Sequence, residues 1–514
     1  MSISALRATS RVWRDAVETV PSHISFGSGG EIFLSKNGAC AIYNPRRESA
    51  SATLAAVEVG SPIVPPSMFS ASGNMPPSAM IHALDDNNNN GAAGASSSLA
   101  LELPGSFALH CVNPVGRKFR DETAKVLRQN ALLSNQRHSG LAVLHLHHAV
   151  ISEQCFVILG DLPSLVDLQL VMCRGVTSLR EVSHMASLQV LDVLMCDVNA
   201  DGVDGLFLPH LKRLKIKRCP RLEAINGIAP ETLASLIELR IEDCPLLADD
   251  SCSDAAGHLR QIERLSLAFT STGEFPMFLS PEARATLREL DMSQTNCSTE
   301  VLQHITEDTK ALEILRLEDC EAILSIQPLE SLTALVALDI SGNDNPQLDA
   351  LSSLGGTLRS LRIADAPFLQ FLSFLRLMSV LEILDLSRSG IGDAEIIPIG
   401  SLKKLQVLFL SGCSSVTNLN PLGACKELRK LFAGATSLTH DGSVMLVGCK
   451  NLEELDVSNT EIESINHFSS LPHLRILNAF GSLESVRDAA EVVETGRVQV
   501  LMDCTLPLRD GSQF

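Results

Sequence analysis

The sequence contains few aromatic residues and no long apolar run. Among its 514 residues are one Trp and one Tyr, and aromatic residues make up 4% of the chain. No stretch reaches the roughly 18 consecutive apolar residues that a membrane-spanning helix requires, and the N-terminal residues lack the apolar core of a secretory signal. These absences exclude a membrane span and predict a soluble, intracellular protein whose core is built from aliphatic side chains.

Positive charge is also scarce. The chain has 41 Lys and Arg against 60 Asp and Glu, which gives a formal net charge of −19 and a pI of about 5.2. A protein that binds nucleic acid by neutralising phosphates needs a basic face. We therefore expect protein partners rather than nucleic acid.

The motifs of common enzyme and metal sites are missing. The sequence has no Walker-type phosphate loop, no G-x-S-x-G motif, no H-E-x-x-H motif and no C-x-x-C pair. His145, His147 and His148 come nearest to a metal-ligand group, but two imidazoles on one strand face without a third ligand favour contact with solvent or a partner. We predict no catalytic activity, no cofactor and no metal site.

The dominant feature that is present is a repeat of apolar residues. Its clearest copy reads Leu312-x-x-Leu315-x-Leu317-x-x-Cys320, and positions are numbered here from the leading residue of each copy. The leading residues of the 15 copies are Leu141, Leu165, Leu188, Leu211, Leu236, Ile262, Leu287, Leu312, Leu335, Leu358, Leu381, Leu405, Leu428, Leu452 and Leu474. The 14 steps average about 24 residues, and the alternating spacing predicts one short strand in each copy.

This pattern resembles the leucine-rich-repeat family. The resemblance implies an α/β solenoid, a horseshoe of about 15 repeats with a parallel sheet on its concave side. Residues 321–332 contain Pro and closely spaced aliphatic residues, which favour 3₁₀ or irregular connections. Residues 389–402 and 436–449 place Asp before an apolar run, which favours a helix with an acidic start. We therefore predict a convex side of mixed helical and 3₁₀ segments.

Several cysteines share one position of the repeat. The ninth position is occupied by Cys173, Cys196, Cys219, Cys244, Cys320 and Cys413. In the leucine-rich-repeat family this position carries Asn or Cys, and the resemblance implies a side chain that turns inward to satisfy backbone groups. A buried thiol can do so as a small apolar group with a weak donor. We expect reduced, structural thiols in a reducing, cytoplasmic compartment.

Composition divides the remainder of the chain. The predicted segments are an N-terminal helix with one hairpin at 1–47, a disordered Ser/Ala/Pro/Asn-rich insertion at 48–100, an N-terminal cap at 101–140, the repeat array at 141–482 and a C-terminal cap with a tail at 483–514. The N-terminal cap includes a helical pattern after Asp121, because the first repeat would otherwise expose its apolar end. The C-terminal cap includes a strand between Arg497 and Cys504.

Three interpretations of residues 1–20 remain open. The first interpretation is a helix packed on the first repeats, because the apolar residues recur with helical spacing. The second is a mitochondrial presequence, because basic residues occur before the first acidic residue. The third is that Leu6, Trp13, Arg14 and Val17 resemble the closing helix of an F-box, whose family docks to Skp1 and cullin in ubiquitin ligases. The preceding Leu-Pro segment of that family is absent here.

The repeat frame predicts which side chains leave the sheet on its concave side. Alternation turns the third, fifth and seventh positions away from the core. The fifth position alternates in sign through Asp291, Arg316, Asp339, Arg362 and Asp385. We interpret this as a ladder of neighbouring opposite charges, which keeps the sheet soluble at about 0–1 kcal/mol for each exposed pair.

Two places depart from this ladder, and we predict that they bind a partner. A basic cluster comprises Arg213, Lys215, Lys217 and Arg240. An aromatic group comprises Phe409, Phe432 and Phe480, and exposed aromatic residues are typical anchors of protein interfaces.

Taken together, these features predict a non-catalytic protein-interaction scaffold that presents a concave repeat surface. One version, implied by the F-box resemblance, is a substrate adaptor of a ubiquitin ligase. The other is a regulatory or structural scaffold, similar to a phosphatase regulator or a cytoskeletal assembly component, with no ubiquitin role.

Overall fold

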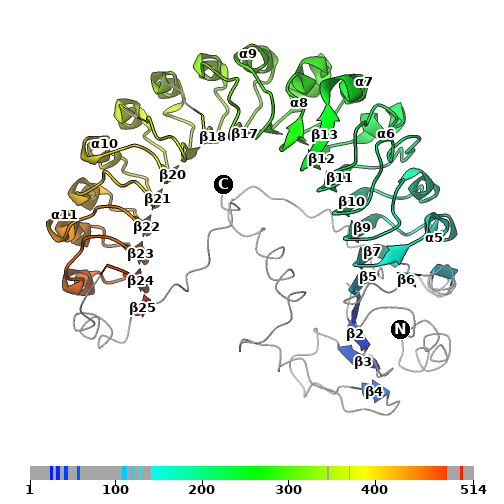
Figure 1. Cartoon of the computed structure of the whole chain (residues 1–514), viewed down its shortest axis with the longest axis horizontal. Helices are drawn as coiled ribbons and strands as arrows, with labels where there is room; N and C mark the ends of the chain where they lie inside the picture. Colours follow the sequence, from blue (N-terminus) through cyan, green and yellow to red (C-terminus); the bar gives the residue numbers. More distant parts are fainter. Residues whose placement is uncertain are drawn as a thin grey trace. The chain divides into compact units, whose positions relative to one another are not determined.

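The computed structural model divides the chain into two compact units, Met1–Ile262 and Glu263–Ser512, called here the first and second unit. The residues that the structure describes are 23–26, 30–34, 40–43, 55–57, 107–112, 118–119, 124–125, 128, 141–160, 162–343, 347–369, 371–482 and 498–501. Within each unit, Figure 1 shows the strands on one side of the chain path and the helical segments on the other.

The first unit contains a parallel sheet with one strand for each repeat. Its strands, in spatial order, are β5 (Phe107–Val112), β7 (Leu141–His147), β9 (Asp167–Val171), β10 (Val190–Leu194), β11 (Arg213–Lys217) and β12 (Glu238–Glu242). The register aligns Leu144, Leu168, Leu191, Leu214 and Leu239, and all five are fully buried. The predicted fourth-position leucines therefore form one continuous row of the core.

Short helical segments connect these strands. They are α5 (Glu153–Leu159), η2 (Arg180–His184), α6 (Pro230–Ser235), η3 (Asp249–Ser251) and α7 (Ser253–His258). Further short strands are β6 (Lys118–Phe119), which pairs with β8 (Val150–Ile151), and β13 (Cys244–Ala248). Helix α5 packs on η2 and α6 packs on α7, so the connections of successive copies cover one another as the strands do.

The second unit repeats the same plan. Its parallel strands are β14 (Arg264–Ser266), β16 (Glu289–Asp291), β17 (Ile314–Arg316), β18 (Ala337–Asp339), β19 (Ser360–Arg362), β20 (Ile383–Asp385), β21 (Val407–Phe409), β22 (Lys430–Phe432), β23 (Glu454–Asp456), β24 (Ile476–Asn478) and β25 (Gln499–Leu501), and a short strand β15 (Thr270–Ser271) follows β14. Strand β25 pairs in parallel with β24, which confirms a strand in the predicted C-terminal segment.

The connections of the second unit confirm the predicted mixture of helical and 3₁₀ segments. They are η4 (Phe275–Phe278), α8 (Pro281–Thr286), α9 (Thr299–Asp308), η5 (Gln327–Ser331), η6 (Leu348–Leu354), η7 (Leu372–Leu377), α10 (Asp393–Ile399), η8 (Asn420–Ala424), α11 (His440–Ser443), η9 (Val444–Gly448) and η10 (Asn466–Ser470). The helices begin where a side chain caps them. Ser298 accepts from the amide of Val301 at the start of α9, and Thr439 accepts from that of Gly442 at the start of α11.

The segments before the repeats differ in part from the prediction. Strands β1 (His23–Phe26), β2 (Gly30–Leu34), β3 (Cys40–Tyr43) and β4 (Ala55–Val57) form an antiparallel sheet. This sheet includes the predicted hairpin, but β4 lies inside the segment predicted to be disordered. Residues 1–20 and the rest of that segment lie outside the described residues.

Residues 101–140 were predicted to form the N-terminal cap of the array. Within this segment, strand β5 pairs in parallel with β7 over Phe107–Val112, with a register shift between Phe107 and Ala108. The sheet therefore begins one strand before the first recognisable repeat. Residues 124–125 and 128 are helical, as the pattern after Asp121 predicts.

A left-handed residue occupies the eighth position of all 15 copies, after the strand. These residues are His148, Met172, Met195, Arg218, Asp243, Phe269, Gln294, Asp319, Gly342, Asp365, Arg388, Gly412, Ala435, Asn459 and Gly481, all with φ between 51° and 78°. Only three of them are glycine, although the conformation costs other residues roughly 1–2 kcal/mol each. The repeat therefore imposes this turn on whichever side chain occupies the position.

The ninth-position side chain follows this turn and hydrogen-bonds to backbone carbonyls. Cys413 Sγ donates to Leu386 O at 3.0 Å, and Cys320 Sγ donates to Met292 O at 3.1 Å. Asn343 makes the equivalent bond to Leu317 O at 2.6 Å. All six predicted ninth-position cysteines are buried, which confirms their structural role. Burial raises the pKa of Cys413 to about 11 and so holds this thiol in its neutral form.

Candidate binding surface

The candidate surface is the face of each sheet that is turned away from the core, called here the inner face. The third, fifth and seventh positions of each copy lie on it, because the fourth and sixth positions face the core. In β11, for example, Leu214 and Ile216 are fully buried, whereas Arg213, Lys215 and Lys217 are half-buried on the opposite side. Strand pairing then places equivalent positions of successive copies in continuous rows.

The predicted basic cluster of the first unit is paired with carboxylates. Arg213 donates two hydrogen bonds to Asp192 on the neighbouring strand, at 3.1 and 3.0 Å. Burial raises the pKa of Asp192 above its ordinary value, and Arg213 opposes that rise. Lys217 forms an ion pair with Glu242 at 3.1 Å. The cluster is therefore a balanced network rather than an open basic patch.

Arg240 completes this network on β12. It pairs with Glu238 at 2.7 Å and with Glu242 at 3.6 Å. Burial would raise the pKa of Glu242, but Lys217 and Arg240 outweigh burial and hold that pKa below its ordinary value. Within the described part of the chain, Lys215 has no carboxylate within ion-pair distance, and it is the one member of the predicted cluster without such a pair.

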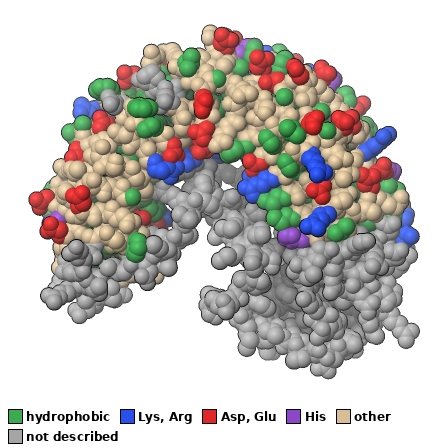
Figure 2. Space-filling model, viewed as in Figure 1, with side chains coloured by type: hydrophobic (Ala, Val, Ile, Leu, Met, Phe, Trp, Pro, Cys, Tyr) green, Lys and Arg blue, Asp and Glu red, His purple; other side chains and the backbone are tan. Residues whose placement is uncertain are grey.

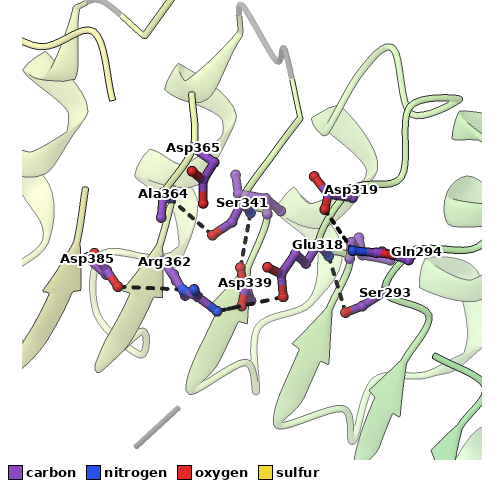
Figure 3. Close-up of polar contacts among 12 residues, drawn as sticks. Ser293, Gln294, Glu318, Asp319, Asp339, Ser341, Arg362, Ala364, Asp365 and Asp385 are labelled. Carbon is purple, nitrogen blue, oxygen red and sulfur yellow. Dashed lines mark hydrogen bonds and ion pairs between the residues drawn. The ribbon is translucent and has the colours of Figure 1, made fainter. Parts of the chain in front are cut away.

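In the second unit the centre of the inner face is an arginine among carboxylates (Figure 3). Arg362 lies 3.1 Å from Asp339, 3.5 Å from Asp385 and 3.7 Å from Glu318. Asp339, Arg362 and Asp385 lie on β18, β19 and β20, and Glu318 follows the end of β17. The predicted charge ladder is present here as contacts between Asp339, Arg362 and Asp385. Burial and the neighbouring Asp339 raise the pKa of Glu318.

Another arginine of this ladder also has a partner in a neighbouring row. Arg316 pairs with Glu289, a third-position residue, at 2.7 Å. Opposite charges therefore meet between rows as well as along one row. On the different face that Figure 2 shows, Lys and Arg side chains also lie among Asp and Glu side chains on the described part of the chain.

The fifth-position aspartates also have a backbone role that the sequence interpretation missed. Asp339 accepts a hydrogen bond from the amide of Ser341 at 3.0 Å, and Asp385 accepts one from Ser387 at 2.9 Å. Asp456 and Ser458 repeat the contact at 2.9 Å. The recurring sequence Leu-Asp-x-Ser was the signal that could have revealed it, because Asp readily bonds a backbone amide two residues ahead. These carboxylates hold the strand end as well as balancing charge.

The predicted aromatic pair is present, but one ring is not exposed. Phe409 and Phe432 lie on neighbouring strands with ring centroids 4.9 Å apart and planes 12° apart, in a stacked arrangement. Phe432 is half-buried, whereas Phe409 is only 3% exposed. The expectation of two exposed anchors is therefore wrong for Phe409. Phe480 is half-buried at the seventh position of its copy, not in the row of the pair.

The remaining predicted site residues do not form a chemical site. Leu6, Trp13, Arg14 and Val17 lie outside the described residues. His145 Nε2 lies 3.3 Å from Asp167 Oδ1, a contact between neighbouring strands. No group of three potential metal ligands occurs among the residues that the structure describes. A search of those same residues finds no helix with the length and apolar character of a membrane span.

Comparison with known proteins supports the repeat assignment. A family model described as the leucine-rich-repeat domain of endo-β-N-acetylglucosaminidase EndoS matches residues 380–479. A leucine-rich-repeat protein from Leptospira interrogans superposes with a TM-score of 0.53 at 17% identity, over 74% of this chain and 92% of that one. An internalin from Listeria monocytogenes has a TM-score of 0.41 at 17% identity, over 73% and 86% of the two chains.

A plant structure is also similar. It is the leucine-rich-repeat ectodomain of a membrane receptor kinase from Arabidopsis thaliana in complex with CASPARIAN STRIP INTEGRITY FACTOR 2, with a TM-score of 0.39 at 15% identity, over 72% of this chain and 53% of that one. The likeness to the Leptospira protein shows the fold. With one strand and one left-handed eighth residue in each of its 15 copies, the chain has the leucine-rich-repeat fold.

Proposed function

We propose that the protein is a non-catalytic scaffold that binds a protein partner on its inner face. The observation that carries this proposal is the geometry of the strands. In every copy the fourth and sixth positions are buried in the core, and the third, fifth and seventh positions lie on the opposite, inner face, where some of them, such as Asp339 and Asp385, are also buried by their neighbours. Successive strands bring these positions into rows, and the rows form a long surface whose chemistry can vary from copy to copy.

The surface is well suited to binding because many of its side chains are already held in place. Arg213 is fixed by two hydrogen bonds to Asp192, and Arg362 is held among three carboxylates. A side chain that is ordered before binding loses less conformational entropy when a partner arrives. The half-buried Phe432, stacked on Phe409, adds an apolar area of the kind that anchors interfaces.

A more specific version of this proposal is a substrate adaptor of a ubiquitin ligase. It is supported by the resemblance of Leu6, Trp13, Arg14 and Val17 to the closing helix of an F-box. In this version the N-terminal residues dock to Skp1, and the inner face holds the substrate. Recovery of Skp1 or a cullin with the wild-type chain, and its loss with Trp13→Ala, is the expected result. A wild-type chain that recovers neither contradicts the adaptor role and leaves a regulatory or structural scaffold.

The scaffold proposal itself is tested by affinity capture with matched variants. Phe432→Ala and Lys215→Ala change the inner face, whereas Leu324→Ala and Lys403→Ala change exposed residues of the connecting segments. We expect captured proteins to be lost with the first pair and kept with the second. Loss with the connecting-segment variants alone would contradict an inner-face partner.

A further inference from the structure

An apolar patch interrupts the inner face of the first unit. It consists of Val171 and Met172 at the end of β9 and Leu194 and Met195 at the end of β10, in the seventh and eighth positions of two neighbouring copies. Val171 is paired in register with Leu194. The amide of Met172 donates to Leu194 O at 2.8 Å. The four residues therefore lie side by side on two adjacent strands.

Elsewhere the same row is not apolar. In the second unit the seventh position carries small or polar residues in every copy except the last, which has Phe480. These residues are Ala268, Ser293, Glu318, Ser341, Ala364, Ser387, Ser411, Gly434 and Ser458. The repeat can therefore be built without a bulky apolar side chain at this position, so the core does not require the half-buried Leu194, nor Val171, which is 8% exposed between its neighbours.

The turn does not explain the methionines either. Met172 and Met195 have φ values of 51° and 53°, a conformation that costs a residue other than glycine roughly 1–2 kcal/mol. Their side chains are half-buried. Methionine is flexible and polarisable, and it is common on surfaces that adapt to a partner.

Charges beside the patch indicate which partner it fits. The next strand, β11, carries Lys215 and Lys217, and Arg218 follows it. Lys217 and Arg218 are paired with carboxylates of β12 and its turn, both at 3.1 Å. Lys215 has no such pair among the described residues, because its nearest neighbour in the row, Asp192, is bound by Arg213. Lys217 is the in-register neighbour of Leu194, and Lys215 lies two residues before it on the same strand, so its ammonium is the cation near the patch without an ion pair among the described residues.

From this arrangement we propose that the patch and Lys215 bind an acidic amphipathic segment of the partner protein. An aliphatic or aromatic side chain of that segment covers Leu194 and the two methionines, and an Asp or Glu beside it pairs with Lys215. This proposal rests on the scaffold function and names the chemistry of its partner. Burying apolar area supplies affinity, and the charge pair selects against basic segments.

The test uses the full chain as bait for a phage-displayed library of random peptides. Enriched peptides are synthesised, and their binding is measured by fluorescence anisotropy. We expect sequences that combine aliphatic or aromatic residues with an excess of Asp and Glu. Leu194→Asp and Lys215→Glu should each weaken binding by about tenfold or more, as removal of a central contact does.

Matched controls separate the patch from general effects of charge. Leu324→Asp makes the same change at a leucine that is 78% exposed in the second unit, and Lys403→Glu makes the same reversal at an exposed connecting segment. Both should keep binding within about twofold, well inside the tenfold effect of a lost contact. Because Leu194→Asp could perturb folding, Lys215→Glu is the deciding variant, and replacing the acidic residues of the peptide by Lys should restore its binding.

Three results would overturn the proposal. Enriched peptides that are basic or purely polar contradict the chemistry. A second such result is a peptide that binds Leu194→Asp and Lys215→Glu as tightly as wild type but loses binding with Phe432→Ala. This result contradicts the proposed patch but is consistent with the scaffold function. A chain that enriches no peptide, or only peptides unaffected by every inner-face change, contradicts both proposals.

Discussion

Replacing Arg362 by Ala tests whether the centre of the second inner face holds the fold together. The guanidinium lies between Asp339 and Asp385, which are only 5% and 3% exposed. Removing it leaves two buried carboxylates without their cation. Breaking a buried ion pair from one side costs about 3–5 kcal/mol. Each carboxylate keeps a backbone amide, so we expect a loss of about 2–4 kcal/mol in the free energy of unfolding.

Arg359→Ala is the matched control. Arg359 precedes the same strand and pairs with Glu382, but these side chains are 56% and 32% exposed, far more than Asp339 and Asp385. An exposed pair contributes only about 0–1 kcal/mol, so this change should be nearly neutral. Urea unfolding of the two variants, followed by far-UV circular dichroism at pH 7, measures the difference.

A loss no larger than that of Arg359→Ala would refute the assignment of Arg362 as the cation that stabilises these two buried carboxylates.

The turns and two buried groups yield further predictions, each measurable by urea unfolding. Ala435→Gly should raise the free energy of unfolding by about 0.5–1 kcal/mol by relieving a left-handed residue, whereas Gly342→Ala should lower it, since Gly342 has a φ of 69°, which strains a residue with a side chain. The opposite pair of signs would contradict the turn assignment. Burial and a neighbouring histidine lower the pKa of His467 to about 4. As pH falls, His467 is therefore protonated in the unfolded chain before it is protonated in the folded one, and the free energy of unfolding should fall by about 1–2 kcal/mol between pH 6.5 and pH 4. The variant His467→Phe should show a smaller fall, and a pH profile equal to that of wild type would refute this role of His467. Cys413→Ser should be nearly neutral because it keeps a donor, whereas Cys413→Val should cost about 1–3 kcal/mol; equal losses would contradict the role of the ninth position.

The repeated spacing of apolar residues predicted the strands, because it can be seen in each copy of the sequence without knowledge of contacts between copies. Leu315 and Leu338 recur at one position of the repeat, and each copy places them in the same row of the core. The inward role of the ninth position was predicted for the same reason. Every copy repeats it, so one copy identifies the rest.

What the sequence did not reveal depends on contacts between copies. The left-handed eighth residue has no compositional signal, because Met172, Arg218 and Ala435 all adopt it. The burial of Phe409 depends in part on the ring stacked against it from the next strand. Likewise, the alternating charges predicted the ladder of opposite charges, but they did not predict that Asp339 would also accept a hydrogen bond from a backbone amide.

Site-specific photo-crosslinking tests the central claim most directly. A photoreactive phenylalanine replaces Gln169, half-buried on the inner face, or Leu324, exposed on the connecting segment between β17 and η5. After irradiation in cells, the account predicts a covalent adduct with a partner protein from position 169 and none from position 324. An adduct that forms from position 324 and not from position 169 would contradict an inner-face binding scaffold.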